Sequence, residues 1–307
     1  MSRHRTGIVL ILCSVLAAGA AFPAAGQSRF GQVLDAKLAA AIGEIEAGLD
    51  GVLGIALKDL ATGRTLLLNE REIFPQASSI KIAVLLETFK QAEEGRLKLE
   101  EFVALEESRK VEGSGILFHL GRPSLSLSVR DLAVLMVVLS DNTATNLLID
   151  KVGLEAVNKR LDALGLPKTR LRRKMMDLQA AAEGRENVST PLEMMTLLEK
   201  IWKGSALGEP SRKDLLAILA IPKDSPLRAG VPEGVEVAEK PGELEAVRCD
   251  SGIVMLTGRP YILCVMTTYL KRDADGNPAI AKVSRTVYEH LARLARSSEI
   301  GRIVSDK

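Results

Sequence analysis

Residues 81–91 read KIAVLLETFKQ, and apolar side chains occupy nearly every side of the helix that this pattern predicts. A helix of that kind is stable only where other elements cover it, so it must lie inside the protein. The 307-residue chain is long enough to bury it within one large or two medium domains, without disulfides or metals for support. With 47% hydrophobic and 26% charged residues, the composition predicts a folded globular protein and argues against disorder.

Strand patterns occur near both ends of the chain, and helical patterns fill the middle. The expected strands are 54–60, 65–69, 235–239, 247–256 and 261–269, and the expected helices are 81–91, 128–140, 154–164, 192–203, 212–220 and 279–296. The turn at 61–63 indicates a hairpin, and Ser128 with Asp131 forms a helix-capping pattern. This order predicts an α/β (α+β) fold with an antiparallel sheet from both chain ends (approximately 27–77 and 232–307), flanked by helices, and a mostly helical lobe (approximately 78–231).

The first 26 residues have the three parts of a secretory signal. Arg3 and Arg5 are followed by the apolar run 8–21 and by small residues at 24–26. The alternative is a membrane anchor, but the run is shorter than the ~20 residues of a spanning helix. A lipoprotein at Cys13 is disfavoured because Leu12 stands where a small residue is expected. We therefore expect an exported protein, periplasmic or secreted, whose mature domain is 27–307.

The charge balance and the cysteines limit the partners and the chemistry. Without Arg3 and Arg5 the 41 basic residues become 39, equal to the 39 acidic residues, which argues against a nucleic-acid partner. Cys249 and Cys264 remain in the mature chain, either as buried thiols on neighbouring strands or, since export permits it, as a disulfide. We expect a monomer that acts on a small molecule.

Ser78 stands just ahead of the buried helix, and Lys81 follows three residues later. On a helix this spacing places the hydroxyl and the amine on one face. A serine hydroxyl becomes an effective nucleophile when a nearby base removes its proton, and a desolvated lysine near another cation is such a base. The alternative is Ser78 as a helix cap and Lys81 as a solvated residue, but the apolar neighbours of Lys81 argue against solvation.

Two further motifs follow in a fixed order. Ser140-Asp141-Asn142 lies 62 residues after Ser78, and Lys240-Pro241-Gly242 follows 100 residues later, at the end of the expected late strand 235–239. With Ser78 to Lys81, they resemble the S-x-x-K, S-D-N and K-T-G set of class A β-lactamases and penicillin-binding proteins. The resemblance extends to TRL at 169–171 and STP at 189–191, which are similar to the two ends of that family's Ω-loop. It covers nearly the whole mature chain.

The resemblance implies a role for each motif. Ser140 would relay a proton to the leaving nitrogen, and Asn142 would bind the substrate amide and Lys81. Lys240 would raise the positive potential over the cleft and keep Lys81 closer to its neutral form. Gly242 and Glu243 would belong to the same substrate-binding strand, and the backbone N–H groups of Ser78 and Glu243 would form the oxyanion hole. Taken singly, each motif is also compatible with a turn or a surface charge.

The Ω-loop departs from the family's pattern. The resemblance places Met175 and Gln179 where the family has the glutamate and asparagine that hold the water for deacylation. Asp177, Gln179 and Glu186 are candidates for a substitute arrangement, as is Glu183. The alternative is that these acids are loop charges paired with Arg172 or Arg173. The hypothesis is that acylation survives and that deacylation is slow or uses another base.

A second departure is Pro241, which stands where the family has a hydroxyl residue that binds the substrate carboxylate. Proline lacks that hydroxyl and an N–H, so binding of the anion weakens unless Arg248 compensates. Arg248 is equally compatible with a surface charge on the strand.

Other hydrolase classes fit the sequence less well. A Ser-His-Asp enzyme has only His119 and His290 available in the mature chain, and the G-x-S-x-G motif is absent. A metal-dependent β-lactamase needs clustered histidines, so neither metal nor cofactor is implied. The sequence therefore predicts a serine hydrolase that opens β-lactam amides through a Ser78 acyl-enzyme. The alternatives are a D-alanyl-D-alanine peptidase, an esterase of the same fold, or a penicillin-binding sensor that stays acylated.

Overall fold

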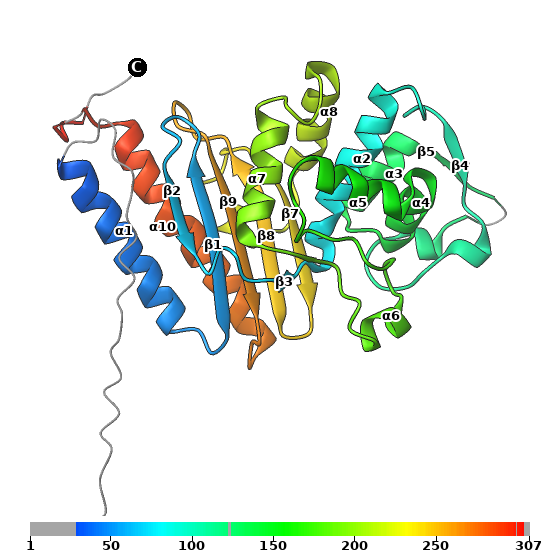
Figure 1. The fold of residues 1–307 in the computed structure, drawn as a ribbon, viewed down its shortest axis with the longest axis horizontal. Helices are drawn as coiled ribbons and strands as arrows, with labels where there is room; N and C mark the ends of the chain where they lie inside the picture. The colour runs from blue at the N-terminus through cyan, green and yellow to red at the C-terminus, as the bar shows by residue number, and fades with distance from the viewer. Residues whose placement is uncertain (1–28, 122–123, 299, 304–307) are drawn as a thin grey trace, which may run out of the picture.

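A five-stranded antiparallel sheet forms the centre of the computed structural model (Figure 1). The structure describes residues 29–121, 124–298 and 300–303. The strands are β1 (Val52–Asp59), β2 (Thr65–Leu68), β7 (Val237–Leu244), β8 (Val247–Val254) and β9 (Tyr261–Thr268). Their order is β2-β1-β9-β8-β7, so the first two strands of the chain lie beside the last three. The expected sheet from both chain ends is confirmed.

The terminal helices cover one face of this sheet. Helix α1 (Arg29–Ala47) and α10 (Gly276–Ala295) lie side by side against it (Figure 1). Apolar residues of both helices and of β1, β8 and β9 form a separate core there. Sequence patterns predicted α10 but not α1, although Leu38, Ile42 and Ile45 follow one helix face and are all buried.

The opposite face of the sheet carries the helical part of the chain. Helix α2 (Lys81–Glu93) is surrounded by η1 (Ala77–Ile80), α3 (Val129–Val138), α4 (Asn142–Val152), α5 (Leu154–Ala163) and α8 (Glu209–Ala220). Ten of its thirteen residues are buried, so the prediction of an internal helix is confirmed. Helix α7 (Pro191–Trp202) packs on β9 and β1, so part of the segment expected in a separate helical lobe covers the sheet itself.

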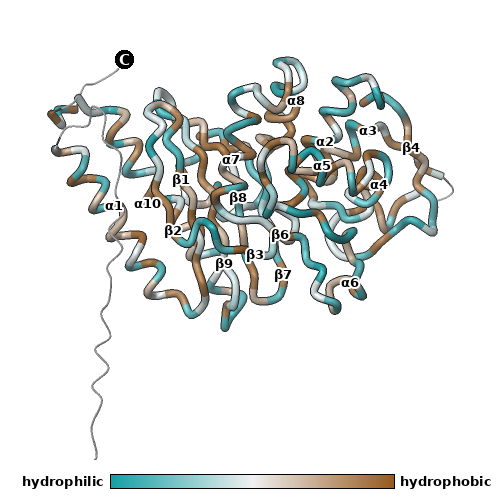
Figure 2. The backbone as a smooth tube through the Cα atoms, in the orientation of Figure 1, coloured by the Kyte–Doolittle hydropathy of each residue, from teal (hydrophilic) through white to brown (hydrophobic). Residues whose placement is uncertain are grey.

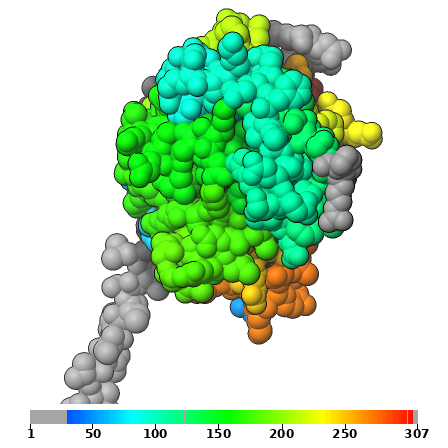
Figure 3. Space-filling model, turned by 90° about the vertical axis from the view of Figure 1, so that its right-hand side faces the viewer, coloured from blue at the N-terminus to red at the C-terminus, as the bar shows by residue number. Residues whose placement is uncertain are grey.

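Figure 3 looks onto the end of the molecule that is on the right in Figure 1. The middle of the chain, coloured cyan to green, forms most of the surface seen there. The remaining short elements are β3 (Phe74–Pro75), β4 (Phe102–Ala104), η2 (Glu107–Arg109), η3 (Leu117–His119), β5 (Ser126–Ser128), α6 (Leu178–Ala182), β6 (Val188–Ser189), α9 (Pro226–Ala229) and η4 (Asp273–Asp275). Two small sheets pair β3 with β6 and β4 with β5. In Figure 2 the apolar stretches lie mainly along the central strands and inner helices.

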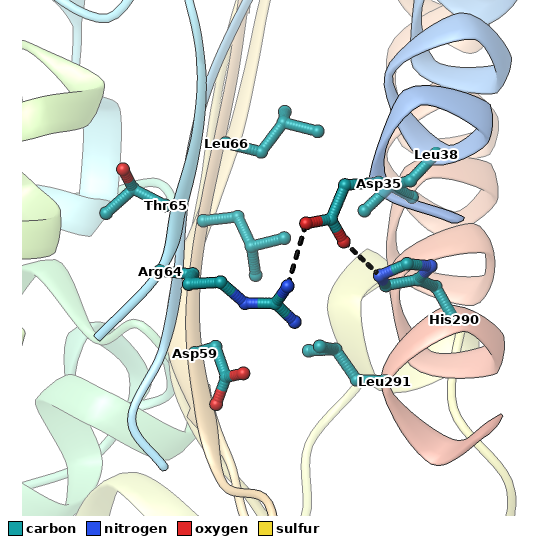
Figure 4. Close-up of a pocket in the computed structure, with 9 residues that line it drawn as sticks. Asp35, Leu38, Asp59, Arg64, Thr65, Leu66, His290 and Leu291 are labelled. Atoms are coloured by element: carbon teal, nitrogen blue, oxygen red, sulfur yellow. Dashed lines mark hydrogen bonds and ion pairs between the residues drawn. The ribbon is translucent and has the colours of Figure 1, made fainter. Parts of the chain in front are cut away.

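A small pocket lies between the sheet and the terminal helices, on the face opposite η1 and α2 (Figure 4). Asp35 lies at its centre, where it accepts a hydrogen bond from Arg64 at 2.9 Å and lies 3.1 Å from His290. Asp59, at the edge of the pocket, pairs with Arg259. The contacts of Asp35 with Arg64 and His290 join α1 to the start of β2 and to α10, so we interpret the pocket as part of the structural framework.

Two further sequence predictions concern the start of the chain and the cysteines. The expected signal at 1–26 lies outside the described residues. None of the helices in the described part of the chain is both long and apolar enough to cross a membrane. Cys249 and Cys264 are free, buried thiols and not a disulfide.

Candidate active site

Ser78 and Lys81 occupy the junction between a short 3₁₀ helix and the buried helix that follows it. Ser78 lies in η1, and Lys81 is the first residue of α2. Ala77, immediately before the serine, has a φ of 44°, in the left-handed region that residues with a side chain seldom adopt. Such strain persists only where the surrounding structure imposes it, and it is frequent at active sites. The fold therefore holds Ser78 in a constrained position at the start of α2.

A second strained residue, Ser140, faces Ser78. It lies between α3 and α4 with a φ of 53°. Its Oγ is 2.8 Å from Oγ of Ser78 and 3.0 Å from Nζ of Lys81. Lys81 also donates to the carbonyl oxygen of Ser140 at 2.7 Å and to Oδ1 of Asn142 at 3.1 Å. Two hydroxyl groups and one amine thus form a continuous hydrogen-bonded chain.

The electrostatic environment of Lys81 favours its neutral form. The side chain is completely buried, and this desolvation holds the pKa of Lys81 well below its ordinary value. The positive charge of Lys240 lowers the pKa further, whereas the carboxylate of Asp141 acts in the opposite direction. Because only the neutral amine accepts a proton, these surroundings suit Lys81 to act as a base.

The loop around Ser140 is anchored by the carboxylate of Asp141. Its Oδ1 caps α4 by accepting from the N–H of Ala144, and its Oδ2 accepts from the N–H groups of Ile116 and Leu117 at 2.7 and 2.8 Å. Gly115 is required here, because a Cβ at that position would lie 2.2 Å from Asp141 Oδ2. One buried carboxylate therefore joins the loop 113–117 to the start of α4 and fixes the position of Ser140.

Strand β7 passes directly beside the backbone of Ser78. A Cβ on Gly242 would lie 2.9 Å from the Ser78 nitrogen and 2.7 Å from the carbonyl oxygen of Gln76, so only glycine allows this approach. Ser79 strengthens the contact by donating from its Oγ to the carbonyl oxygen of Lys240 at 2.7 Å. Cys249 packs beneath the same junction, with its Sγ 3.1 Å from the Gln76 oxygen. The nucleophile and Lys240 are thus held at one interface.

Lys240 is buried, and its surroundings lower the pKa of its side-chain amine. Desolvation lowers the pKa of Lys240 to about 8, although the carboxylates of Asp250 and Glu239 act in the opposite direction. Its Nζ donates to the carbonyl oxygen of Pro241 at 2.9 Å. Glu239 in turn pairs with Lys223 at 3.2 Å and with Arg228 at 3.3 Å. Lys240 is therefore the cation that this strand contributes to the cluster, and its charge is lost near pH 8.

The edge position of β7 explains how a proline fits within it. β7 pairs only with β8, and the N–H of Met255 donates to the carbonyl oxygen of Glu236 just before the strand. Antiparallel pairing alternates, so Pro241 and Glu243 direct their backbone groups away from β8. Pro241 consequently removes no hydrogen bond from the sheet. The N–H of Glu243 is therefore not used in the hydrogen bonds between β7 and β8. It lies on the side of β7 where η1 lies.

Arg248 and the Glu243 side chain meet at the end of the β7–β8 hairpin. Arg248 donates through Nη1 to the carbonyl oxygens of Leu244 and Val247 at 2.6 and 2.7 Å. Its guanidinium also lies 3.9 Å from the Glu243 carboxylate and 3.5 Å from that of Asp273. Arg248 is thus engaged with the protein's own acceptors, and its contacts do not include the Ser78–Lys81–Ser140 cluster.

The loop between 169 and 191 reaches the cluster through its methionines. Asn146 on α4 accepts from the N–H of Met175 at 2.8 Å and donates to its carbonyl oxygen at 3.0 Å. Met176 Sδ would lie 3.1 Å from a Cβ on Gly113, and that same Cβ would lie 2.7 Å from Nδ2 of Asn142. Residues 175–176 therefore pack against α4 and the loop at Gly113, on the side of Asn142.

The candidates for a substitute deacylation group have other partners on the loop, and Glu183 pairs with Arg185. Asp177 is exposed and caps α6 by accepting from the N–H of Ala180. Gln179 is exposed and donates to Glu183 at 3.0 Å. Glu186 is paired with Arg173 at 2.9 Å. Each has a local structural partner, and the structure does not bring any of them together with the serines.

The cluster has the parts needed for nucleophilic catalysis: a hydroxyl, a relay hydroxyl, a base and a nearby cation. Neither of the two histidines in the described part of the chain belongs to it, because His290 contacts Asp35 on the far face and His119 packs edge-on against Phe118. Among residues 29–121, 124–298 and 300–303, no group of three histidine, cysteine or acidic side chains is placed to hold a metal ion.

Residues 37–291 match the model of the β-lactamase enzyme family, which is most of the chain. This chain belongs to that family. A β-lactamase of Stenotrophomonas maltophilia is 30% identical over 261 residues, which cover 82% of this chain and 84% of that protein. Family membership makes this chain a serine hydrolase of β-lactamase type.

Solved structures of the β-lactamase family share the fold. A β-lactamase of Sphaerobacter thermophilus has a TM-score of 0.76 and 32% identity, with 83% of this chain and 96% of that chain covered. A mutant of PBP-A, solved as an acyl-enzyme complex with penicillin G, has the same TM-score with 30% identity and the same coverage.

Sequence reasoning missed Asn146 and the separate helix α4 on which it lies. Asparagine and threonine are modest helix formers, so the run NTATN gave little helical signal. Asp141 stands directly before it and is a good N-cap residue, which is the local pattern that predicts a helix start. Asn146 follows Asn142 by four residues and therefore shares its face of the helix.

Proposed function

We propose that the protein hydrolyses β-lactams through an acyl-enzyme on Ser78. The observation that carries this proposal is the hydrogen-bonded chain from Ser78 through Ser140 to Lys81, whose buried amine favours its neutral form. Family membership supports the β-lactam substrate class.

In the acylation step the proton of Ser78 passes to the oxygen of Ser140 while the proton of Ser140 passes to neutral Lys81. The freed oxygen attacks the β-lactam carbonyl, and the N–H groups of Ser78 and Glu243 stabilise the oxyanion that forms. The C–N bond then breaks, and the proton held by Lys81 returns through Ser140 to the leaving nitrogen. Asn142 and Lys240 orient the substrate and Lys81. Each proton that leaves Ser78 is thus accounted for.

The release step lacks an evident base. Met175 stands where the resemblance places the deacylating glutamate, and Asp177, Gln179 and Glu186 have local structural partners. A water molecule entering the acyl-enzyme would meet only Ser140 and Lys81 as proton acceptors. Acylation should therefore outpace release. Slow release is also compatible with the alternative functions, which are a D-alanyl-D-alanine peptidase or esterase and a sensor that stays acylated.

A pre-steady-state assay tests this difference in rates. With excess benzylpenicillin we expect a burst of product equal to the enzyme concentration, followed by a slow steady state. Met175→Glu should raise the steady rate by about a hundredfold, because a positioned general base contributes that much or more. Met175→Gln, of similar size without a base, is the matched control. Rapid turnover by the wild type without a burst, unchanged in Asp177→Asn and Glu186→Gln, would contradict slow release.

The two lysines predict a bell-shaped pH dependence for acylation. Lys81 accepts a proton only when neutral, so the rate should fall as pH drops through its lowered pKa. Lys240 is charged only below about 8, so its contribution should be lost as pH rises through the pKa of about 8. Lys240→Arg keeps its charge in this range and should move the alkaline limb upward. An unchanged alkaline limb in this variant would assign that limb to another group.

We also propose that the chain is exported, with a signal cleaved near Gly26, and that it acts as a monomer. The basic, apolar and small-residue segments at the start of the sequence support export. The equal numbers of acidic and basic residues from Gln27 onward support a small-molecule substrate and not a nucleic acid.

A further inference from the structure

The thiol of Cys249 lies where β8 and β7 meet the turn that carries the nucleophile. Cys249 is the register partner of Gly242, and its side chain is on the face of the sheet that packs against η1. The residue is buried. A Cβ on Gly242 would lie 2.9 Å from Sγ of Cys249 and 2.9 Å from the nitrogen of Ser78. The sulfur is therefore close to the backbone of both elements.

Three oxygen atoms surround this thiol. Its Sγ lies 3.1 Å from the carbonyl oxygen of Gln76, 3.3 Å from Oγ of Ser79 and 3.6 Å from the carbonyl oxygen of Gly242. Each can accept a hydrogen bond from an S–H group. Burial raises the pKa of the Cys249 thiol to about 12, so the group keeps its proton across the working pH range. Cys249 thus acts as a hydrogen-bond donor and not as a second nucleophile.

On the side of the nucleophile, the thiol contacts the turn that encloses Ser78. The carbonyl oxygen of Gln76 also accepts from the N–H of Ser79 at 2.8 Å, which closes this turn around Ala77 and Ser78. Ala77 has a strained φ of 44°, and such a conformation persists only where surrounding contacts impose it. A hydrogen bond from the thiol to Gln76 is one of these contacts, so it helps to fix the direction of the Ser78 N–H.

On the side of the strand, the thiol contacts the peptide unit that supplies the second N–H group of the expected oxyanion hole. The carbonyl of Gly242 and the N–H of Glu243 belong to one planar unit and point in opposite directions. The carbonyl is directed toward β8, where Cys249 lies, and the N–H is directed away from β8. One buried side chain therefore contacts the backbone on both sides of the oxyanion hole.

The second buried thiol of the described residues provides a comparison. Cys264 lies on β9 opposite Ser251, on the same face of the sheet as Cys249, and its hydrogen-bond partner is Ser251. Both thiols pack in the same apolar core. Burial and packing are thus common to the two cysteines, whereas the contacts with Gln76 and Ser79 distinguish Cys249.

We propose that Cys249 is a positioning residue for acylation, whose S–H group holds the N–H groups of Ser78 and Glu243 in the relative position that an oxyanion requires. This inference rests on the acylation of Ser78 proposed above and adds a residue of β8 to that site. The oxyanion develops only as the carbonyl is attacked. The thiol should therefore affect the rate of the acylation step and not the noncovalent binding of the substrate.

Rapid mixing with benzylpenicillin, followed by intact mass spectrometry, separates the limiting rate constant of acylation from the dissociation constant of the noncovalent complex. Cys249→Ala should lower the rate constant by about tenfold, which corresponds to about 1.4 kcal/mol, and leave the dissociation constant unchanged. Cys249→Ser keeps a donor and should stay within about threefold of the wild type. Phenylboronic acid, which forms a tetrahedral adduct with a serine hydroxyl, should bind Cys249→Ala about tenfold more weakly, because its adduct resembles the transition state.

Two further variants control for packing. Cys264→Ala removes the comparable buried thiol and should leave both constants unchanged. Cys249→Val fills the space without a donor, so it should match Cys249→Ala and replaces that variant in the test if the alanine protein does not fold. A folded Cys249→Ala or Cys249→Val that acylates at the wild-type rate, or an equal loss in Cys264→Ala, would overturn the positioning role alone. Absence of an adduct from the wild type would overturn it together with Ser78 acylation.

Discussion

Ser78→Ala is expected to lower the rate of β-lactam opening by about 10,000-fold or more, because the hydroxyl supplies the attacking atom. In the proposed mechanism Lys81 and Ser140 transfer protons and do not attack the carbonyl carbon, so they cannot compensate for its loss. The remaining rate would come from substrate binding and from the backbone N–H groups near the alanine. The measurement is the initial rate with a chromogenic cephalosporin at saturating and limiting concentrations.

A matched control separates loss of chemistry from loss of structure. Ser205→Ala removes a serine hydroxyl that donates to the carbonyl oxygen of Lys200 on an exposed turn, and it should leave the rate unchanged. The thermal unfolding midpoint of Ser78→Ala should stay close to that of the wild type, since only Ser140 loses a hydrogen-bond partner. Retention of more than a tenth of the rate in folded Ser78→Ala would show that another group attacks.

Lys81→Met is expected to slow acylation of Ser78 by about a thousandfold, within the range that general-base catalysis contributes. Methionine is similar in length to lysine and suits the buried position, so the change removes the proton acceptor while keeping the packing of α2. The acylation rate should also lose the acidic limb of its pH profile, because that limb reports the titration of Lys81. The measurement is the rate of adduct formation between pH 5 and 9.

Lys90→Met provides the control on the same helix. Lys90 pairs with Glu93 near the end of α2, away from the serines, so its replacement should change neither the rate nor the profile. An acidic limb that persists in Lys81→Met would assign proton removal to a different group. A loss of less than tenfold would reduce Lys81 to an electrostatic role.

Slow release changes what such an enzyme does for a cell. An acyl-enzyme that persists consumes one β-lactam for each protein molecule, whereas rapid release makes each molecule catalytic. We propose that this difference depends on position 175, where Asn146 holds the backbone of Met175. The protein therefore combines the acylation parts of a β-lactamase with a loop that supplies no evident base.

The sequence predicted the elements whose patterns are strong and local. The internal helix α2 is apolar on nearly every side, and the β1–β2 hairpin has a clear turn, so both were expected with small errors at their ends. Helix α1 was missed although its buried residues are regularly spaced. Strand β7 was expected to end at residue 239, yet it runs to Leu244 because an edge strand tolerates Pro241.

The grouping of the motif residues in space could be predicted where residue type and order were sufficient. Ser78, Lys81, Ser140, Asn142 and Lys240 stand in three short motifs, and the structure brings them into one cluster. The loop acids could not be placed from sequence, because their partners depend on how the loop folds. Glu186 binds Arg173, which was the alternative weighed for these loop charges.

Arg248 shows the same limit more sharply. Its position on β8 allowed either an exposed charge or a ligand for a substrate anion, and no local pattern distinguishes the two. The structure engages its guanidinium with two backbone carbonyls and two carboxylates, one of which belongs to η4 far along the chain. Whether such an arginine pairs with the protein's own acceptors depends on how segments far apart in the sequence pack together.

The most direct test of the acyl-enzyme mechanism is the mass of the intact mature protein during incubation with benzylpenicillin, followed by peptide mapping of the adduct. We expect the mass to rise by that of one benzylpenicillin, the adduct to persist after free antibiotic is removed, and the label to map to Ser78. A protein that consumes benzylpenicillin without gaining mass, or an adduct on any other residue, would contradict the mechanism.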